Sequence, residues 1–227
     1  MNILIIEDDP ICAKSLAIAV KNEGHFYYIC DNGTEGLNAA REGLYDAILL
    51  DINLPDSDGF QLARTIRQSN TDTPVLVVSG RSSVTDRVVA LSAGADGYLI
   101  KPFDRQELLA NLTAIIRRTN GHADSRIVTG PIAVDINKHE VMVGKKRLKL
   151  TSKEYHILEL LSLRKGSTLT KSHFINHLYG GIDEPESKII DVFICKLRKK
   201  LADLTGGKNY IHTVWGQGYV LRDTASD

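Results

Sequence analysis

The sequence predicts an α/β first half built on a parallel sheet, followed by a smaller α+β second half. In the first half, five short apolar runs alternate with segments of helical periodicity, which is the pattern of consecutive βα units. After residue 126 the pattern changes to short β-like runs, amphipathic helices and a final pair of runs around a Gly-rich turn. Charge divides the chain in the same way: residues 1–120 carry 11 Lys and Arg against 16 Asp and Glu, a net of −5, and residues 121–227 carry 17 against 12, a net of +5. This asymmetry favours a metal-binding or regulatory domain joined to one that binds a polyanion.

Strands joined in sequence by helices are expected to form a parallel sheet with right-handed crossovers, here a flavodoxin-like (βα)5 doubly wound sheet. The predicted strands are Ile3–Ile6, Phe26–Cys30, Ala47–Leu50, Val75–Val78 and Tyr98–Ile100. The predicted helices lie near Ile11–Asn22, Thr34–Glu42, Gly59–Asn70, Val84–Ala93 and Arg105–Thr119.

Acidic side chains follow the first and third of these strands. Asp51 is the first charge after the buried run, and Glu7, Asp8 and Asp9 follow the first strand. Ligands of open parallel sheets bind beyond the carboxyl ends of the strands, so these carboxylates are expected to meet. They would repel one another without a cation, and oxygen ligands with room for water and phosphate favour Mg²⁺. A solvated aspartate at position 51, or a helix cap at Asp8 or Asp9, is the structural alternative.

A hydroxyl and an ammonium end the remaining two strands of this edge, at Ser79 and Lys101. Aspartate can act as a nucleophile toward phosphorus, and the oxygens of a transferred phosphoryl group need neutralising charge. Lys101 precedes Pro102, and an X-Pro bond at such a tight corner is a candidate cis peptide. The edge therefore has the residue types that phosphoryl transfer to Asp51 requires.

With these residues at the ends of its strands, the segment of residues 1–119 resembles the receiver domain of bacterial two-component response regulators. The family pattern is an acidic pair after strand one, Asp after strand three, Ser or Thr after strand four and Lys-Pro after strand five, and all of it is present. The resemblance implies that Asp51 is the phospho-acceptor and that Tyr98 is the aromatic side chain that turns inward on activation. It also implies Mg²⁺ ligands at Glu7, Asp8, Asp51 and the Asn53 backbone carbonyl, with phosphoryl contacts from Ser79 and Lys101.

The second half, residues 127–223, is predicted as a separate domain after a flexible linker at residues 120–126. A small antiparallel sheet is expected from Ile132–Val134, Val141–Val143 and Leu148–Leu150. Thr151 and Glu154 fit a capping box that begins a helix, and Thr170 opens a second helix that stops at Tyr179, Gly180 and Gly181.

A third helix, from about Glu186 to Ala202, carries two faces. An apolar stripe for the core consists of Ile190, Ile194, Leu197 and Leu201. The opposite face has lysines around small apolar groups, which suits phosphates, guanine edges and thymine methyls in the major groove. Its residues are Lys188, Val192, Cys195, Lys196 and Lys199. A plain solvated basic face is the alternative.

The last two strands, within Ile211–Leu221, form a predicted hairpin wing around a Gly-rich turn. Residues 127–222 together resemble the winged-helix output domain of OmpR/PhoB-type regulators, most closely those that control the cell cycle in alphaproteobacteria. The resemblance implies that the third helix, with Arg198 beside its lysines, enters the major groove and that the wing, with Trp215 and Gln217, approaches the minor groove. Many relatives carry an arginine at one of these two wing positions, so minor-groove attraction is expected to be weaker here.

Members of this family are thought to dimerise through helix four, strand five and helix five. Arg87 and Glu107 match one charged pair of that interface. Gly97 and Asn111 stand where another pair, normally Asp and Arg, is found. A homodimer linked to phosphorylation is therefore expected, but a weak one that forms chiefly on tandem DNA half-sites.

The leading hypothesis is a phosphorylation-controlled, DNA-binding transcription regulator, not an enzyme, that acts with a histidine kinase or phosphotransferase and with RNA polymerase. A phosphoaspartate phosphatase of the haloacid-dehalogenase type is an alternative, although its general acid would be an Asp where this chain has Asn53. A DNA binder with a vestigial receiver is a second alternative. Three scattered cysteines, Cys12, Cys30 and Cys195, and a core strand that begins directly after Met1 favour a cytoplasmic protein with reduced thiols.

Overall fold

The computed structural model describes residues 1–42, 45–69, 72–180 and 185–224. The chain divides into two compact units, Met1–Thr119 and Asn120–Asp227. No helix among these described residues is long and apolar enough to span a bilayer.

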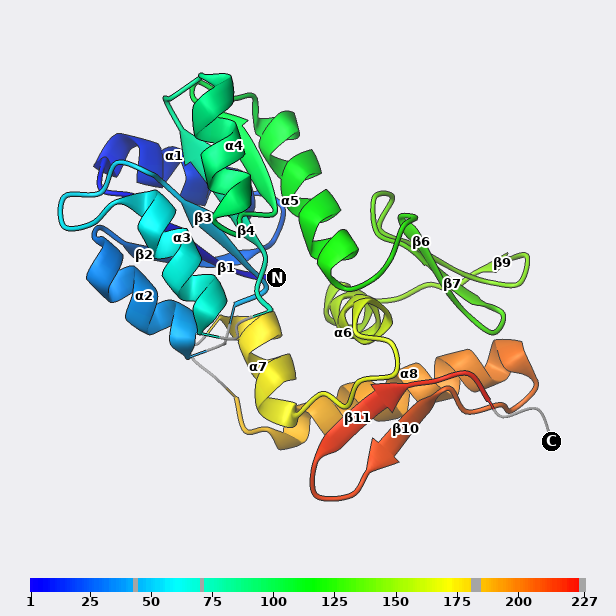
Figure 1. Ribbon diagram of the computed structural model, residues 1–227. Coiled ribbons are helices and arrows are strands. Elements are labelled where there is room, and N and C mark those ends of the chain that lie inside the picture. Colours follow the sequence, from blue (N-terminus) through cyan, green and yellow to red (C-terminus); the bar gives the residue numbers. More distant parts are fainter. Residues whose placement is uncertain (43–44, 70–71, 181–184, 225–227) are drawn as a thin grey trace. The chain divides into compact units, whose positions relative to one another are not determined.

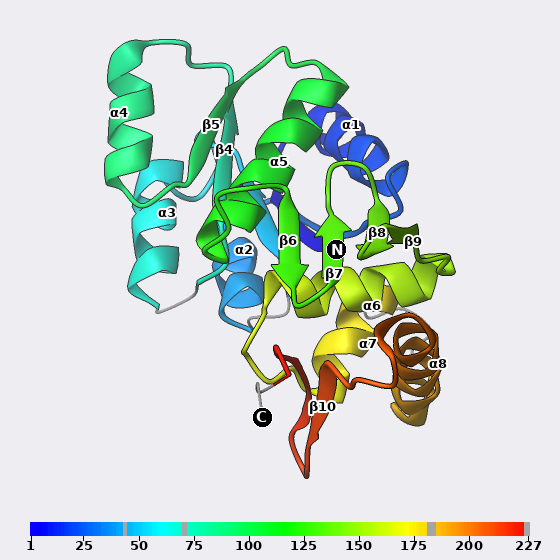
Figure 2. The same cartoon turned by 90° about the vertical axis from the view of Figure 1, so that its right-hand side faces the viewer.

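The first unit is a five-stranded parallel sheet in the order β2-β1-β3-β4-β5 (Figure 1). This is the predicted doubly wound fold. Helices α1 and α5 pack together on one face of the sheet, and α2, α3 and α4 cover the other (Figure 2). The elements, in chain order, are β1 Asn2–Ile6, α1 Pro10–Lys21, β2 Phe26–Cys30, α2 Gly33–Arg41, β3 Ala47–Leu50, α3 Gly59–Gln68, β4 Val75–Ser79, α4 Val84–Ser92, β5 Gly97–Ile100 and α5 Arg105–Thr119.

The helices of this unit begin where the sequence supplies a short polar cap. Asp9, Asn32, Asp58 and Ser83 each accept a hydrogen bond from a backbone N–H of the helix that follows. Such caps satisfy the first N–H groups of a helix, which have no partner within it. Asp9 is thus a helix cap, which was the alternative interpretation of that residue. Glu7 and Asp8 remain as the acidic residues of this segment that lie beside Asp51. Asn70, the predicted end of the third helix, lies outside the described residues.

The second unit combines an antiparallel sheet, three helices and a separate hairpin. Helix α6 packs against α7, α8 and the sheet, and its apolar side contributes Ile157, Leu158 and Leu161 to a buried core. The elements are β6 Arg126–Thr129, β7 Ile132–Asp135, β8 Glu140–Val143, β9 Lys146–Arg147, α6 Ser152–Leu163, α7 Lys171–Tyr179, α8 Lys188–Thr205, β10 Ile211–Val214 and β11 Gly218–Leu221.

The predicted strand at Leu148–Leu150 is wrong, because β9 consists only of Lys146 and Arg147. Leu148 is buried and its N–H still bonds to Val141, but the chain then leaves the sheet for the N-cap of α6. There the predicted capping box is confirmed, with Thr151 and Glu154 bonding to each other's backbone N–H. The predicted helix end at Gly181 lies outside the described residues, and α7 ends at Tyr179 with Gly180 in a left-handed cap.

Candidate metal centre and nucleic-acid interface

The register of the parallel sheet places Glu7 next to Asp51. Ile6 pairs with Leu50, the last residues of β1 and β3, and the Asp51 N–H donates to the Ile6 carbonyl at 2.9 Å. Both carboxylates are buried, whereas Asp8 is exposed. One oxygen from each of the three residues lies within 4.8 Å of the others, so the structure brings the predicted carboxylates together.

Lys101 lies at the end of β5 and forms an ion pair with both buried carboxylates. Its Nζ donates to Glu7 Oε2 at 2.6 Å and to Asp51 Oδ2 at 2.8 Å. Burial alone would lower the pKa of Lys101, but these hydrogen bonds outweigh it and raise the pKa, so the side chain is an ammonium at neutral pH. The bond between Lys101 and Pro102 is cis.

One carboxylate oxygen of Glu7, Oε1, is available to bind a cation. Burial raises the pKa of its carboxyl, the charge of Asp51 adds to that effect, and Lys101 opposes it. Within the described part of the chain, Glu7 Oε1 is buried without a hydrogen-bond partner, apart from a weak interaction with the Cys12 thiol. Burial raises the pKa of that thiol to about 11, so Cys12 supplies no thiolate. A buried carboxylate oxygen with no strong donor, next to two further carboxylates, fits a hard divalent cation such as Mg²⁺.

Backbone and side-chain bonds fix the remaining groups of this edge. Asp51 Oδ1 accepts hydrogen bonds from the N–H groups of Ile52, at 2.6 Å, and Asn53, at 3.3 Å. The hydroxyl of Ser79 is buried, at the end of β4, and accepts the N–H of Arg81 at 3.2 Å. Asp51 is therefore held in one orientation, with the Ser79 hydroxyl anchored at the same sheet edge.

Arg81 is a residue of this site that the sequence analysis missed. Its guanidinium donates to Asn53 Oδ1 at 2.8 and 3.1 Å, and its carbonyl accepts the hydroxyl of half-buried Tyr98 at 2.7 Å. The side chain of Asn53 is thus occupied, which leaves its backbone carbonyl for the predicted metal role. Arg81 therefore connects the loop beside Asp51 with the aromatic residue of β5.

Helix α8 presents the two faces that its periodicity predicts. Ile190, Ile194, Leu197 and Leu201 are buried. The opposite face is open to solvent, as the exposed residues Lys188, Val192, Cys195, Lys196 and Lys199 show. A partly apolar, basic helix face of this kind matches the chemistry of a DNA groove.

The hairpin β10–β11 is tied to this helix by two side chains. Arg198 donates to the Ile211 carbonyl and to the Thr213 hydroxyl, both at 2.8 Å, so its guanidinium is largely engaged within the protein. Asp191 accepts a hydrogen bond from Tyr219 at 2.6 Å and pairs with Lys171 of α7 at 2.8 Å. At the hairpin tip Trp215 is 90% exposed, and Gln217 is exposed as well.

The residues of the predicted dimer face lie on α4, β5 and α5. Arg87 and Glu107 are both exposed, whereas Gly97 and Asn111 are half-buried. Next to Arg87, α4 also exposes a group of large apolar side chains, which are Val84, Val88, Val89 and Leu91. A surface that combines exposed apolar groups and charges is suited to protein contact.

Comparisons with known proteins agree with this architecture. The model of the response regulator receiver domain matches residues 3–113, and that of the C-terminal domain of transcriptional regulatory proteins matches residues 144–221. The chain is 53% identical over 223 residues to the cell cycle response regulator CtrA of Brucella ovis and of Brucella abortus, covering 98% of this chain and 96% of the relative.

Among solved structures, the receiver domain of the Francisella response regulator 1452 is 30% identical, with a TM-score of 0.50 over 52% of this chain and 98% of that one. A two-component response regulator from Clostridium difficile is 32% identical, with a TM-score of 0.50 over 53% of this chain and 99% of that one. The two family matches and the near full-length similarity to CtrA lead to one conclusion. The chain belongs to the OmpR/PhoB-type family of two-component response regulators, in which a receiver domain precedes a winged-helix DNA-binding domain.

Proposed function

We propose that this protein is a transcription regulator whose DNA binding is controlled by Mg²⁺-dependent phosphorylation of Asp51. The observation that carries the proposal is the contact of Lys101 with both Glu7 and Asp51 at the carboxyl edge of the sheet. A fixed ammonium beside a buried carboxylate supplies positive charge where the oxygens of an incoming phosphoryl group would lie.

The residues of the edge have distinct tasks in this reaction. A carboxylate oxygen of Asp51 attacks phosphorus, the bond from phosphorus to the donor breaks, and an acyl phosphate forms. Glu7, Asp8, Asp51 and the Asn53 carbonyl would hold Mg²⁺, which supplies charge neutralisation to the phosphoryl oxygens. Lys101 would exchange its bond to Asp51 Oδ2 for one to the phosphoryl group, and Ser79 would donate its hydroxyl.

Phosphorylation is proposed to reach the second unit through pairing of receivers. A histidine kinase or phosphotransferase would supply the phosphoryl group, and the α4–β5–α5 face would pair two copies. The exposed face of α8 would then occupy the major groove of tandem half-sites, with Trp215 and Gln217 near the minor groove. Because Arg198 is bonded to β10, we assign it the task of fixing the wing beside this helix.

The name of the relatives, cell cycle response regulator, supports the further proposal that the regulated genes include cell-cycle genes, transcribed with RNA polymerase in the cytoplasm. The reaction itself is tested with acetyl phosphate and Mg²⁺, followed by mass measurement of the intact protein. A stable gain of about 80 Da, the mass of one phosphoryl group, is expected in the natural protein. Asp51→Asn should gain nothing while keeping its circular dichroism, because the two side chains are nearly isosteric.

Other outcomes would contradict the proposal. An Asp51→Asn protein that still takes the phosphoryl group would overturn the assignment of the acceptor. Rapid, repeated hydrolysis without a stable adduct would favour a phosphatase, and a natural protein that takes no label would favour a vestigial receiver.

A further inference from the structure

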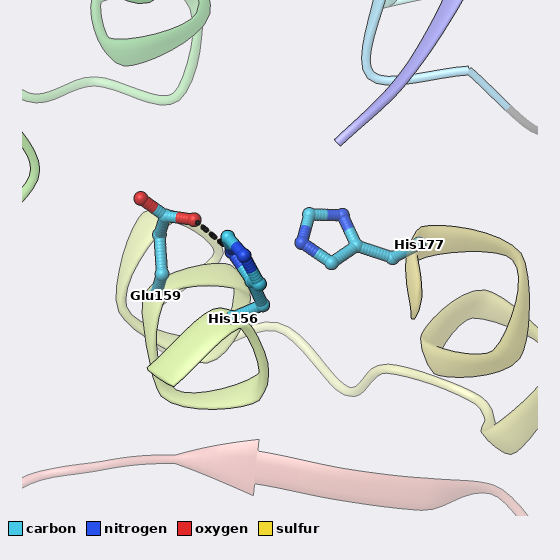
Figure 3. A group of neighbouring side chains, drawn as sticks. All are labelled: His156, Glu159 and His177. Atoms are coloured by element: carbon cyan, nitrogen blue, oxygen red, sulfur yellow. Dashed lines mark hydrogen bonds and ion pairs between the residues drawn. The ribbon is translucent and has the colours of Figure 1, made fainter. Parts of the chain in front are cut away.

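Two histidines and a glutamate converge within the second unit, and none of them belongs to the sites described above. His156 and Glu159 are one turn apart on α6, and the ring of His177 faces them from α7 (Figure 3). One ligand atom of each residue lies within 4.8 Å of the others. The two imidazole rings are 6.3 Å apart between centroids and inclined by 69°.

These separations are close to those of a coordinated ion. Bonds of about 2.0–2.1 Å to Zn²⁺ in tetrahedral geometry place neighbouring ligand atoms about 3.3 Å apart. His156 Nδ1 and Glu159 Oε2 already lie 3.2 Å apart. The third ligand atom, from His177, would have to move by at most about 1.5 Å, which is within the reach of a side-chain rotation.

The surroundings orient the carboxylate as the outer groups of a metal site do. The hydroxyl of Tyr155 donates to Glu159 Oε1 at 2.9 Å and leaves Oε2 toward the histidines. Glu159 and His177 are buried. A buried carboxylate that is held at one oxygen by a hydroxyl and has its other oxygen near two imidazoles matches the arrangement of ligands and outer groups in a metal site.

We propose that His156, Glu159 and His177 bind one divalent transition-metal ion of the Zn²⁺ class, with an open position for water. Two imidazoles and a carboxylate form a ligand set that Zn²⁺ adopts, whereas Mg²⁺ prefers the all-oxygen set of Glu7, Asp8 and Asp51. The ion would join α6 to α7, which itself contacts α8 through the pair of Lys171 and Asp191. Metal occupancy would thereby stiffen the support of the DNA-binding helix.

The test uses the full-length protein, first freed of metal and then placed in excess Mg²⁺. The Mg²⁺ keeps the proposed site at Glu7, Asp8 and Asp51 occupied. Co²⁺ serves as the probe because its visible absorption reports tetrahedral coordination. We expect one equivalent of Co²⁺ to bind with these bands and to be displaced by Zn²⁺, which binds such sites more tightly. His156→Gln should weaken Co²⁺ binding at least tenfold, while His173→Gln, a control one turn before His177 on α7, should leave it unchanged.

Two further variants make the result specific. Tyr155→Phe keeps all three ligands and removes only the hydroxyl that orients Glu159, and it should weaken binding about 10- to 100-fold. Asp51→Asn should retain the Co²⁺ bands in full, which separates this site from the receiver edge and from the proposed phosphorylation. Absence of the bands in the natural protein, equal binding by a folded His156→Gln protein, or loss of the bands in Asp51→Asn would overturn the proposal. The cluster would then be an ordinary hydrogen-bonded pair of His156 and Glu159 with His177 packed beside it.

Discussion

Gly59 allows the loop after β3 to fold back against the residues that carry the site. A Cβ atom at this position would lie 2.5 Å from the Asp51 carbonyl oxygen and from the Cα of Ile52. The Gly59 N–H also donates to the Ile52 carbonyl at 3.0 Å. Since both close neighbours are backbone atoms, they cannot move aside as a flexible side chain would.

Gly59→Ala should therefore destabilise the first unit and disturb Asp51. We expect a loss of about 1–3 kcal/mol in the free energy of unfolding, the range for overpacking of a closed site, and slower labelling by acetyl phosphate. Urea unfolding and intact mass measure the two effects. Gly80→Ala is the matched control, because a Cβ there meets nothing within 4 Å. Equal stability of the two variants would contradict this explanation of the loop.

The residues at the carboxyl edge of the parallel sheet were predictable individually, since each follows a strand of a sheet whose geometry is known in advance. Glu7, Asp51 and Lys101 need only the order and register of the strands to meet. Arg81 was not predictable, because its position depends on how the loop after Ser79 folds back toward Asn53. Likewise, the spacing of His156 and Glu159 is visible in the sequence, but the approach of a third ligand depends on the packing of α7 against α6.

At the scale of elements, α8 shows that hydrophobic periodicity predicts the faces of a helix better than its exact ends. The buried stripe and the exposed basic face are confirmed, because both follow from 3.6 residues per turn. The ends differ: α8 begins at Lys188 and continues to Thr205, three residues beyond the predicted Ala202. Gly206, in a left-handed conformation, ends the helix. The apolar stripe continues to Leu204, which packs against the same core, so the pattern extends almost to the observed end of the helix.

Lys196→Ala and Lys199→Ala should each weaken DNA binding and reduce the slope of log affinity against log salt by about one. Each lysine lies on the exposed face of α8, and if this face binds DNA as proposed, loss of its ammonium would remove one phosphate contact. Fluorescence anisotropy at several salt concentrations measures the slope. Lys145→Ala, an exposed lysine between β8 and β9, is the control and should behave as the natural protein. A slope unchanged in both α8 variants would exclude this face as the groove-binding surface.

Glu154 connects the beginning of α6 with α8, because its Oε2 accepts both the Thr151 N–H at 2.8 Å and the Lys200 ammonium at 2.6 Å. Burial raises the pKa of Glu154, but these hydrogen bonds outweigh it and hold the pKa below the ordinary value. A carboxyl whose pKa is lowered by folding stabilises the fold above its unfolded pKa, about 4.3, and loses that contribution as pH falls through the folded pKa.

Glu154→Gln should therefore cost about 1 kcal/mol of stability in the second unit at pH 7, the value typical of a lost cap or charged hydrogen bond. The difference between variant and natural protein should shrink as pH falls below about 4.3. Urea unfolding followed on amide resonances of α6 and α8 isolates the second unit. A difference that stays constant down to the acid transition would mean that the charge of Glu154 is not the cause.

At the scale of the whole molecule, the residues of the predicted dimer face bear on how two copies of the protein would assemble. Gly97 packs closely, since a Cβ there would lie 2.9 Å from Leu76 Cδ1 and 3.3 Å from Ile115 Cγ2. Restoring the missing charge pair with Gly97→Asp would therefore disturb the core as well as the surface. The existing pair, Arg87 and Glu107, is exposed and offers a cleaner test of pairing.

We expect the free protein to be mostly monomeric, and Arg87→Glu or Glu107→Arg to weaken phosphorylation-dependent pairing about tenfold, which corresponds to about 1.4 kcal/mol. The double variant should recover it, because the charges are then exchanged across the two-fold axis. Analytical ultracentrifugation with and without beryllofluoride as the phosphoryl mimic measures the association. A tight dimer of the unphosphorylated protein at low micromolar concentration, or no recovery in the double variant, would refute this arrangement.

The contacts of Arg81 have a consequence for gene control. One arginine is bonded both to the loop beside Asp51 and to the hydroxyl of Tyr98. Bonds that hold this conformation lower the fraction of molecules that adopt another one spontaneously. For a regulator that works as proposed here, that fraction determines the background level of transcription in the absence of a signal. The hydrogen bonds of the Arg81 side chain would thus set the level of transcription from a target promoter while the kinase of this regulator is inactive.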